Sequence, residues 1–159
     1  MSNNLKLACV ELFRETFEGV APGSNGTWFV QGREAVLPSI QALTPEQAST
    51  AFPDGRATIG AHVNHLCYYL HLFNVHKRGE EEASDWEGSW KIQTFDAAAW
   101  KDVMDRTLAE YEEASHWYRL QAESDSDFAT EEKAISAIAN IAHAAFHLGA
   151  IRALIPQVQ

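Results

Sequence analysis

The chain has 159 residues, of which 46% are hydrophobic, and its 22 acidic and 12 basic side chains give a formal net charge of −10. This length suits one domain with its own core, and the apolar fraction excludes a disordered chain. The negative charge opposes binding to phosphate backbones and anionic lipid surfaces, and no glycine-rich phosphate loop is present. We therefore expect a single domain over residues 1–159 with a small-molecule substrate, and neither nucleic acid nor a membrane as partner.

The start of the chain and its two cysteines favour a cytoplasmic location. Residues 1–5 lack the basic-then-apolar order of a secretory signal. The chain also has no uninterrupted run of about 18 apolar residues, which a membrane span would need. Cys9 and Cys67 each lie inside an apolar helical pattern. We interpret them as buried free thiols and not as a disulfide.

The first third of the chain predicts one long helix followed by a less regular region. Apolar residues recur at helical spacing from Asn4 to Glu18, and the helix breakers of residues 21–26 follow. Within the irregular region, residues 44–47 (Thr-Pro-Glu-Gln) have the pattern of a capping box and predict a short helix. Residues 53–55 (Pro-Asp-Gly) predict a turn.

The remainder of the chain predicts three more long helices. Their expected ranges are Thr58–Lys77, Asp96–Ala122 and Glu131–Ile155, the last capped by Thr130 and stopped by Pro156. An acidic, tryptophan-rich loop (residues 80–93) and a polar linker (residues 123–127) separate them. The fold class is therefore all-α, a four-helix bundle with a short helical insert between helices 1 and 2.

The last long helix carries the strongest chemical signal. It is apolar around most of its circumference, and Ser136, Asn140, His143 and His147 fall on one narrow side. His143 and His147 are four residues apart, so their imidazoles lie one turn above each other and are able to chelate one metal ion. The glutamate that serves zinc peptidases as a base in the HExxH motif is missing. Two ordinary core histidines are the alternative interpretation.

A third ligand is available on the second long helix. His62 and His65 both lie beside its apolar stripe, and periodicity does not choose between them. Three neutral imidazoles with an open coordination position are typical of a catalytic zinc or nickel site more than of a closed structural one.

Two segments of the chain resemble the DinB/YfiT-like superfamily. Residues 58–66 are similar to its second-helix motif, in which a histidine followed by leucine is a metal ligand. Residues 143–152 are similar to its C-terminal motif, a histidine pair four apart followed by a small residue and an arginine. Weaker similarity covers Trp28, residues 37–48, and the loop of Trp86 and Trp90.

The resemblance implies a bundle with longer connections than a simple up-and-down bundle, and a homodimer. It also implies a divalent metal, zinc, nickel or iron, on His65, His143 and His147. Characterised members include thiol-dependent S-transferases and isomerases that use low-molecular-weight thiols. One departure concerns the activity: many relatives carry another histidine and Arg-Gly-Gln after the final ligand, where this chain has Leu148, Gly149 and Ala150.

These features and the resemblance predict a protein that binds a divalent metal. The predicted activity is that of a metal-dependent thiol S-transferase or hydrolase acting on a small molecule. No catalytic residue is assigned. The side chains expected to support the ligands or line the pocket are His62, Tyr69, Asn140, Trp86 and Trp90. A non-catalytic metal- or ligand-binding stress protein is the main alternative, and a di-iron site using Glu113 and His116 is a weaker one.

Overall fold

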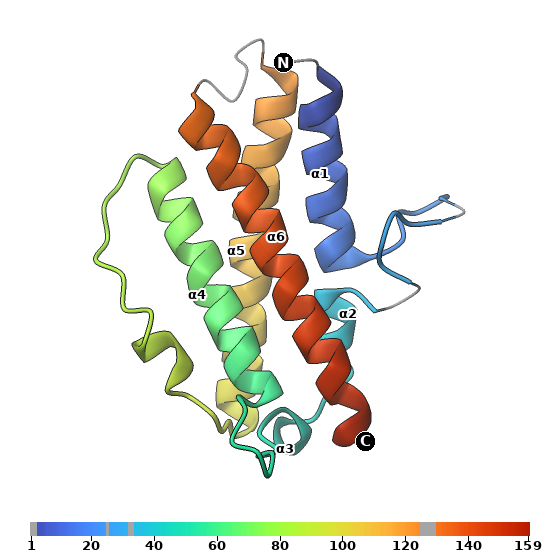
Figure 1. Ribbon diagram of the computed structural model, residues 1–159, viewed down its shortest axis with the longest axis vertical. Coiled ribbons are helices and arrows are strands. Elements are labelled where there is room, and N and C mark those ends of the chain that lie inside the picture. Colours follow the sequence, from blue (N-terminus) through green and yellow to red (C-terminus); the bar gives the residue numbers. More distant parts are fainter. Residues whose placement is uncertain (1–2, 25, 32–33, 125–129) are drawn as a thin grey trace.

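The computed structural model describes residues 3–24, 26–31, 34–124 and 130–159, and within these ranges it is all-helical (Figure 1). Four long helices form a bundle in which α4 and α1 each pack against both α5 and α6. Two short helices, α2 and α3, lie at the end of the bundle where the chain terminates. The helix bounds are α1 Asn3–Glu18, α2 Val36–Gln41, α3 Pro45–Ala48, α4 Ile59–Lys77, α5 Ala97–Glu123 and α6 Glu131–Leu154, with 3-10 turns at η1 Gly88–Trp90 and η2 Ile155–Gln157.

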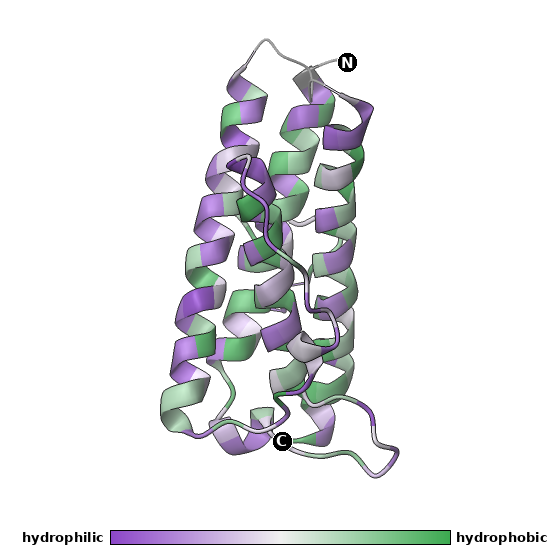
Figure 2. Cartoon of the chain, turned by 90° about the vertical axis from the view of Figure 1, so that its left-hand side faces the viewer, coloured by the Kyte–Doolittle hydropathy of each residue, from purple (hydrophilic) through white to green (hydrophobic). Residues whose placement is uncertain are grey.

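The order of the helices differs from a simple up-and-down bundle. In Figure 1, α1 and α6 run in one direction and α4 and α5 in the other. Because α4 and α5 are parallel, the chain between them returns along the length of the bundle, which Figure 2 shows from the side. We call residues 80–93 of this connection the strap. The long connections implied by the resemblance are therefore present.

The predicted helix starts are confirmed by their caps. Thr58, Asp96 and Thr130 each accept a hydrogen bond from the backbone N–H three residues further on. Thr44 and Gln47 form the complete capping box expected of α3.

Helix α2 was not predicted, so the short helical insert is two helices and not one. It has six residues and no side-chain cap, and Pro38 lies in its first turn, where a missing N–H is tolerated. Of the polar linker predicted at 123–127, residues 125–127 lie outside the described residues.

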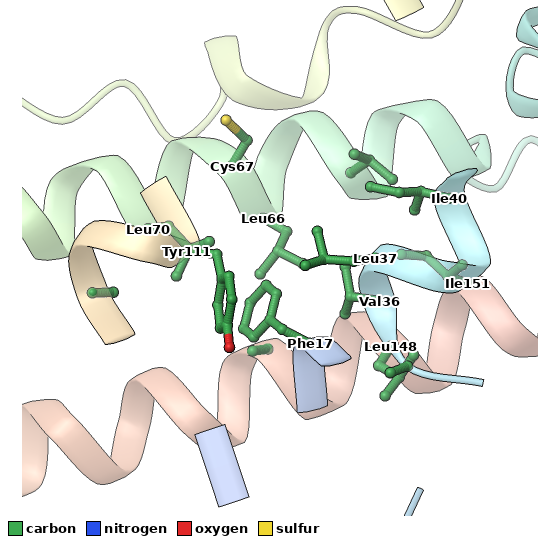
Figure 3. Packing of buried hydrophobic residues seen from close by; sticks show 14 of the residues in the cluster. Phe17, Val36, Leu37, Ile40, Leu66, Cys67, Leu70, Tyr111, Leu148 and Ile151 are labelled. Carbon is green, nitrogen blue, oxygen red and sulfur yellow. The ribbon is translucent and has the colours of Figure 1, made fainter. Parts of the chain in front are cut away.

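The core joins the long helices to α2. Figure 3 shows Phe17 of α1 beside Val36 and Leu37 of α2, with Leu148 and Ile151 of α6 nearby; all five are buried. Cys9 and Cys67 are buried free cysteines, as predicted, and burial raises the pKa of both thiols.

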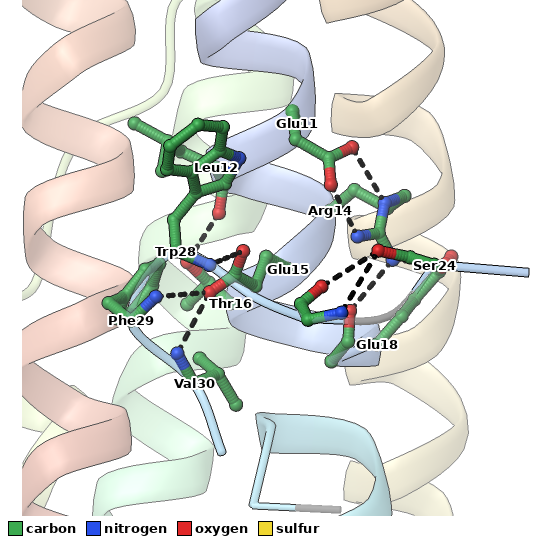
Figure 4. Close-up of polar contacts among 12 residues, drawn as sticks. Glu11, Leu12, Arg14, Glu15, Thr16, Glu18, Ser24, Trp28, Phe29 and Val30 are labelled. Carbon is green, nitrogen blue, oxygen red and sulfur yellow. Dashed lines mark hydrogen bonds and ion pairs between the residues drawn. The ribbon is translucent and has the colours of Figure 1, made fainter. Parts of the chain in front are cut away.

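A buried carboxylate fixes the loop that follows α1. Glu15 is fully buried and accepts N–H hydrogen bonds from Trp28, Phe29 and Val30 at 2.8, 2.6 and 2.8 Å (Figure 4). Three backbone donors at one carboxylate compensate the cost of burying its charge. Glu15 thereby holds residues 28–30 of the loop against α1.

Helix α6 and the following turn (Glu131–Gln157) are long and apolar enough to cross a membrane by length and composition. A core helix passes the same test. Helix α6 packs against both α1 and α4, but only 39% of its most apolar window is buried, so part of its apolar surface is exposed.

Candidate metal centre

His65, His143 and His147 converge where α4 and α6 pack together. One nitrogen atom of each ring lies within 4.8 Å of those of the other two. The ring centroids are 5.3 Å apart for His65 and His143, 5.0 Å for His65 and His147, and 4.5 Å for His143 and His147. His65 and His147 are 7% and 1% exposed and His143 is half-buried, so the group lies mostly in the interior and is reached from the side of His143. Their role as ligands stays a prediction, whereas their convergence is a property of the fold.

The spacing of the pair on α6 matches what a single ion requires. His143 Nε2 and His147 Nε2 are 3.2 Å apart. Zinc–nitrogen bonds of about 2.0–2.1 Å in tetrahedral geometry place two ligand nitrogens about 3.3 Å apart. Among the residues that the structure describes, no fourth histidine, cysteine or carboxylate joins the group of three. The donor set therefore fits a divalent metal with an open coordination position.

The hydrogen bonds of Ser89 determine which nitrogen of His65 is free. The Ser89 hydroxyl lies 2.7 Å from Trp86 O, to which it donates, and 2.7 Å from His65 Nδ1. Because a hydroxyl has one hydrogen, His65 Nδ1–H must donate to Ser89, which leaves the lone pair of His65 on Nε2. Asn64 fixes Ser89 in turn by donating to its backbone carbonyl at 2.8 Å.

Ser89 is not among the site residues predicted from the sequence. Its signal was its place between Trp86 and Trp90 in the loop segment that resembles the family. Spacing along the chain gave no link to His65, because the contact joins residues 24 positions apart.

His62 does not belong to the group of three. Its Nδ1 lies 3.1 Å from Nδ1 of His147, on the opposite side of that ring from the atom that faces His143. Packing therefore brings His65 into the group of three and places His62 on the other side of His147, while the choice of metal ligand that periodicity left open stays a prediction.

Aromatic rings surround the three histidines. Trp90 stacks on His65 with centroids 4.1 Å apart, and Tyr69 stacks on His143 at 3.7 Å. Trp86 lies 6.2 Å from His65 and 5.9 Å from Tyr69. These apolar faces limit the access of water to the imidazoles.

The strap brings the two tryptophans to this place. Along α4, Glu82 contacts His71 Nε2 at 2.9 Å, and the Asp85 N–H donates to the Tyr68 hydroxyl at 2.6 Å. With Ser89 at His65, these contacts hold the strap against α4 over about two turns of the helix. The pKa of His71 is raised because Glu82 and then Glu110 hydrogen-bond to it.

Most of the chain matches the sequence profile of one protein family. The sequence profile of the DinB superfamily matches residues 29–151, which include all three converging histidines. The chain belongs to the DinB superfamily. No match was found among curated proteins or among solved structures. Membership of the DinB superfamily agrees with the all-helical fold. It does not by itself assign an activity to this protein.

Burial keeps the histidines of this DinB-superfamily site neutral. Burial, and after it the neighbouring imidazoles, lowers the pKa of His65 and of His143 to about 4 and that of His147 to about 3. The pKa of His62 is also lowered by burial. All four rings are thus uncharged at pH 7, which is the state that a metal ion requires of its ligands.

The other two polar residues of the α6 stripe have separate positions. Ser136 accepts a hydrogen bond from Lys77 Nζ at 3.0 Å. Asn140 is fully buried, and neither atom of its amide has a hydrogen-bond partner in the described protein. A pocket role for Asn140 remains a prediction.

The di-iron alternative is wrong. Glu113 and His116 are both exposed on α5, and Glu113 pairs with Arg78. A di-iron carboxylate site needs these side chains to project into the bundle.

Proposed function

We propose that this DinB-superfamily protein binds one divalent metal ion through His65, His143 and His147 and uses it to transfer a thiol to a small electrophilic molecule. The observation that carries the proposal is the convergence of three neutral imidazole nitrogens from α4 and α6 within 4.8 Å, with no fourth side-chain ligand among the described residues. Zinc, nickel and iron all accept such a set, and availability decides among them.

The absence of the peptidase glutamate favours a thiol over water as the nucleophile. When bound, a divalent ion supplies Lewis acidity that lowers the pKa of a thiol or water in its open position. A free thiol has a pKa of about 8.5 and is already close to ionising at pH 7. Water starts from a pKa of about 15.7, and zinc peptidases that use it add a glutamate base to the metal. The residues between His143 and His147 are Ala144, Ala145 and Phe146, so the peptidase glutamate has no counterpart. Hydrolysis is therefore the second choice.

The side chains of the chain itself have supporting roles in this proposal. Ser89 orients the imidazole of His65 through its Nδ1. Trp90 and Tyr69 cover the faces of His65 and His143, and they exclude water from the reacting groups. In the reaction, sulfur forms a bond to carbon of the electrophile, the leaving group departs with its electron pair, and the thiol proton passes to solvent.

Conjugation of thiols to 1-chloro-2,4-dinitrobenzene tests the proposal. We expect untagged, metal-loaded protein to accelerate the reaction of at least one low-molecular-weight thiol by more than tenfold. We expect the acceleration to vanish after chelation and to return on adding the metal. Stoichiometric metal without turnover, across a panel of thiols and electrophiles, would instead support a non-catalytic metal- or ligand-binding protein.

We also propose that the protein is a homodimer formed through α6. Ile135, Ile138 and Phe146 are 59%, 48% and 67% exposed, and no charged residue occurs between Lys133 and Arg152. In a chain of net charge −10, an uncharged face suits contact with a second copy, because two such faces meet without charge repulsion.

Sedimentation velocity measures this assembly. We expect the wild-type protein to be a dimer, Phe146→Glu to be a monomer, and Leu120→Glu, at an exposed leucine of α5, to remain dimeric. A wild-type monomer at all concentrations would contradict the proposal.

A further inference from the structure

We propose that His62 is a positioning residue that fixes His147 in the tautomer able to bind the metal. The proposal rests on the metal site argued above and adds a residue that is not one of its ligands. Its starting point is that both ring nitrogens of His147 contact another histidine: Nε2 lies 3.2 Å from His143 Nε2, and Nδ1 lies 3.1 Å from His62 Nδ1.

A neutral imidazole carries one N–H, so the contact with His62 has two arrangements. If His62 Nδ1–H donates to His147, the hydrogen of His147 is on Nε2 and points toward His143. If His147 Nδ1–H donates to His62, the lone pair of His147 is on Nε2 and faces the other ligands. Only the second arrangement allows metal binding, and it requires an acceptor at the position of His62 Nδ1.

His65 has a similar hydrogen bond at its Nδ1, and there the donor can be identified. His65 Nδ1–H donates to Ser89, whose own hydrogen is directed to Trp86 O. Ligating histidines generally donate their second N–H to a protein acceptor, which fixes the ring and raises its basicity. In this molecule the acceptor is a hydroxyl for His65 and an imidazole for His147.

His62 is itself held in place by the strap. Its ring meets Trp90 edge-on, with centroids 5.2 Å apart and an interplanar angle of 86°. Trp90 in turn stacks on His65 at 4.1 Å. Turn η1, which contains Ser89 and Trp90, therefore orients one ligand directly and a second through His62.

The test compares two replacements of His62. His62→Phe keeps a ring against Trp90 and removes the acceptor, whereas the Oδ1 of His62→Asn restores an acceptor near the position of Nδ1. Cobalt(II) is added alone to metal-free protein, and affinity is measured by competition with a chromophoric chelator, together with the visible ligand-field spectrum. His76→Phe, at an exposed histidine of the same helix, is the matched control.

We expect His62→Phe to bind one cobalt ion per chain about 10- to 100-fold more weakly than wild type, with an altered spectrum. We expect His62→Asn and His76→Phe to bind within about threefold of wild type, as a support role predicts. Should phenylalanine prevent folding, His62→Ala against His62→Asn makes the same comparison.

Two results would overturn the inference without removing the metal site. The first is wild-type cobalt affinity and spectrum in His62→Phe. The second is a complete loss of cobalt binding in His62→Phe, equal to that in His65→Phe, which would make His62 a ligand. Absence of cobalt binding by the wild type would instead overturn the metal site and this inference together.

Discussion

Replacing His147 with alanine is expected to remove stoichiometric metal from the protein. His147 is 1% exposed, and its Nε2 lies 3.2 Å from His143 Nε2. Its loss leaves only His143 on α6 and His65 on α4 as donors. A site with two neutral imidazoles holds zinc, nickel or iron far more weakly than one with three. The metal content of untagged protein, measured by elemental analysis, is expected to fall from one ion per chain to below about 0.1. A fall of this size corresponds to a loss of roughly 100-fold or more in affinity, and removing a ligand costs more than the 10- to 100-fold typical of removing a partner of a ligand.

The control for this variant is an exposed histidine. His116→Ala on α5 is expected to keep one ion per chain, whereas His65→Ala and His143→Ala should behave like His147→Ala. Full occupancy in His147→Ala would remove the basis for a shared site.

The second large effect is on stability. Glu15→Gln is expected to lower the free energy of unfolding by about 3 kcal/mol, because hydrogen bonds to a charged group contribute about 1.5–3 kcal/mol each and the amide replaces one acceptor oxygen with a donor. The three affected N–H groups are those of Trp28, Phe29 and Val30. Urea denaturation of the metal-free protein measures the change without a contribution from a bound ion.

Glu11→Gln is the matched control on the same helix. Glu11 pairs with Arg14 at 2.8 Å, and its side chain is 41% exposed, so the pair is expected to contribute less than about 1 kcal/mol. A Glu15→Gln protein as stable as the Glu11→Gln protein would show that the loop after α1 does not depend on the buried carboxylate.

Local features of the sequence were sufficient to predict the long helices and one edge of the site. Helix caps act within four residues, so Thr58, Asp96 and Thr130 could be identified without the fold. The same holds for His143 and His147, which a single helix places one turn apart.

Features that depend on contacts between distant segments could not be predicted in this way. His62 and His65 are three residues apart on one helix, and each lies beside its apolar stripe. Both contact His147 of α6, but only His65 joins the group of three, and this is decided by the packing of α4 against α6 and by the strap. Ser89 was missed for the same reason. Helix α2 was missed because its six residues have no cap and are held by the tertiary core.

The central claim is that one ion is bound between α4 and α6 by three imidazoles. Anomalous diffraction at the absorption edge of zinc, nickel or iron, from crystals of untagged protein, tests it most directly. We expect one peak per chain at about 2.0–2.2 Å from Nε2 of His65, His143 and His147. No peak at this position, or a peak bound to other side chains, would contradict the account.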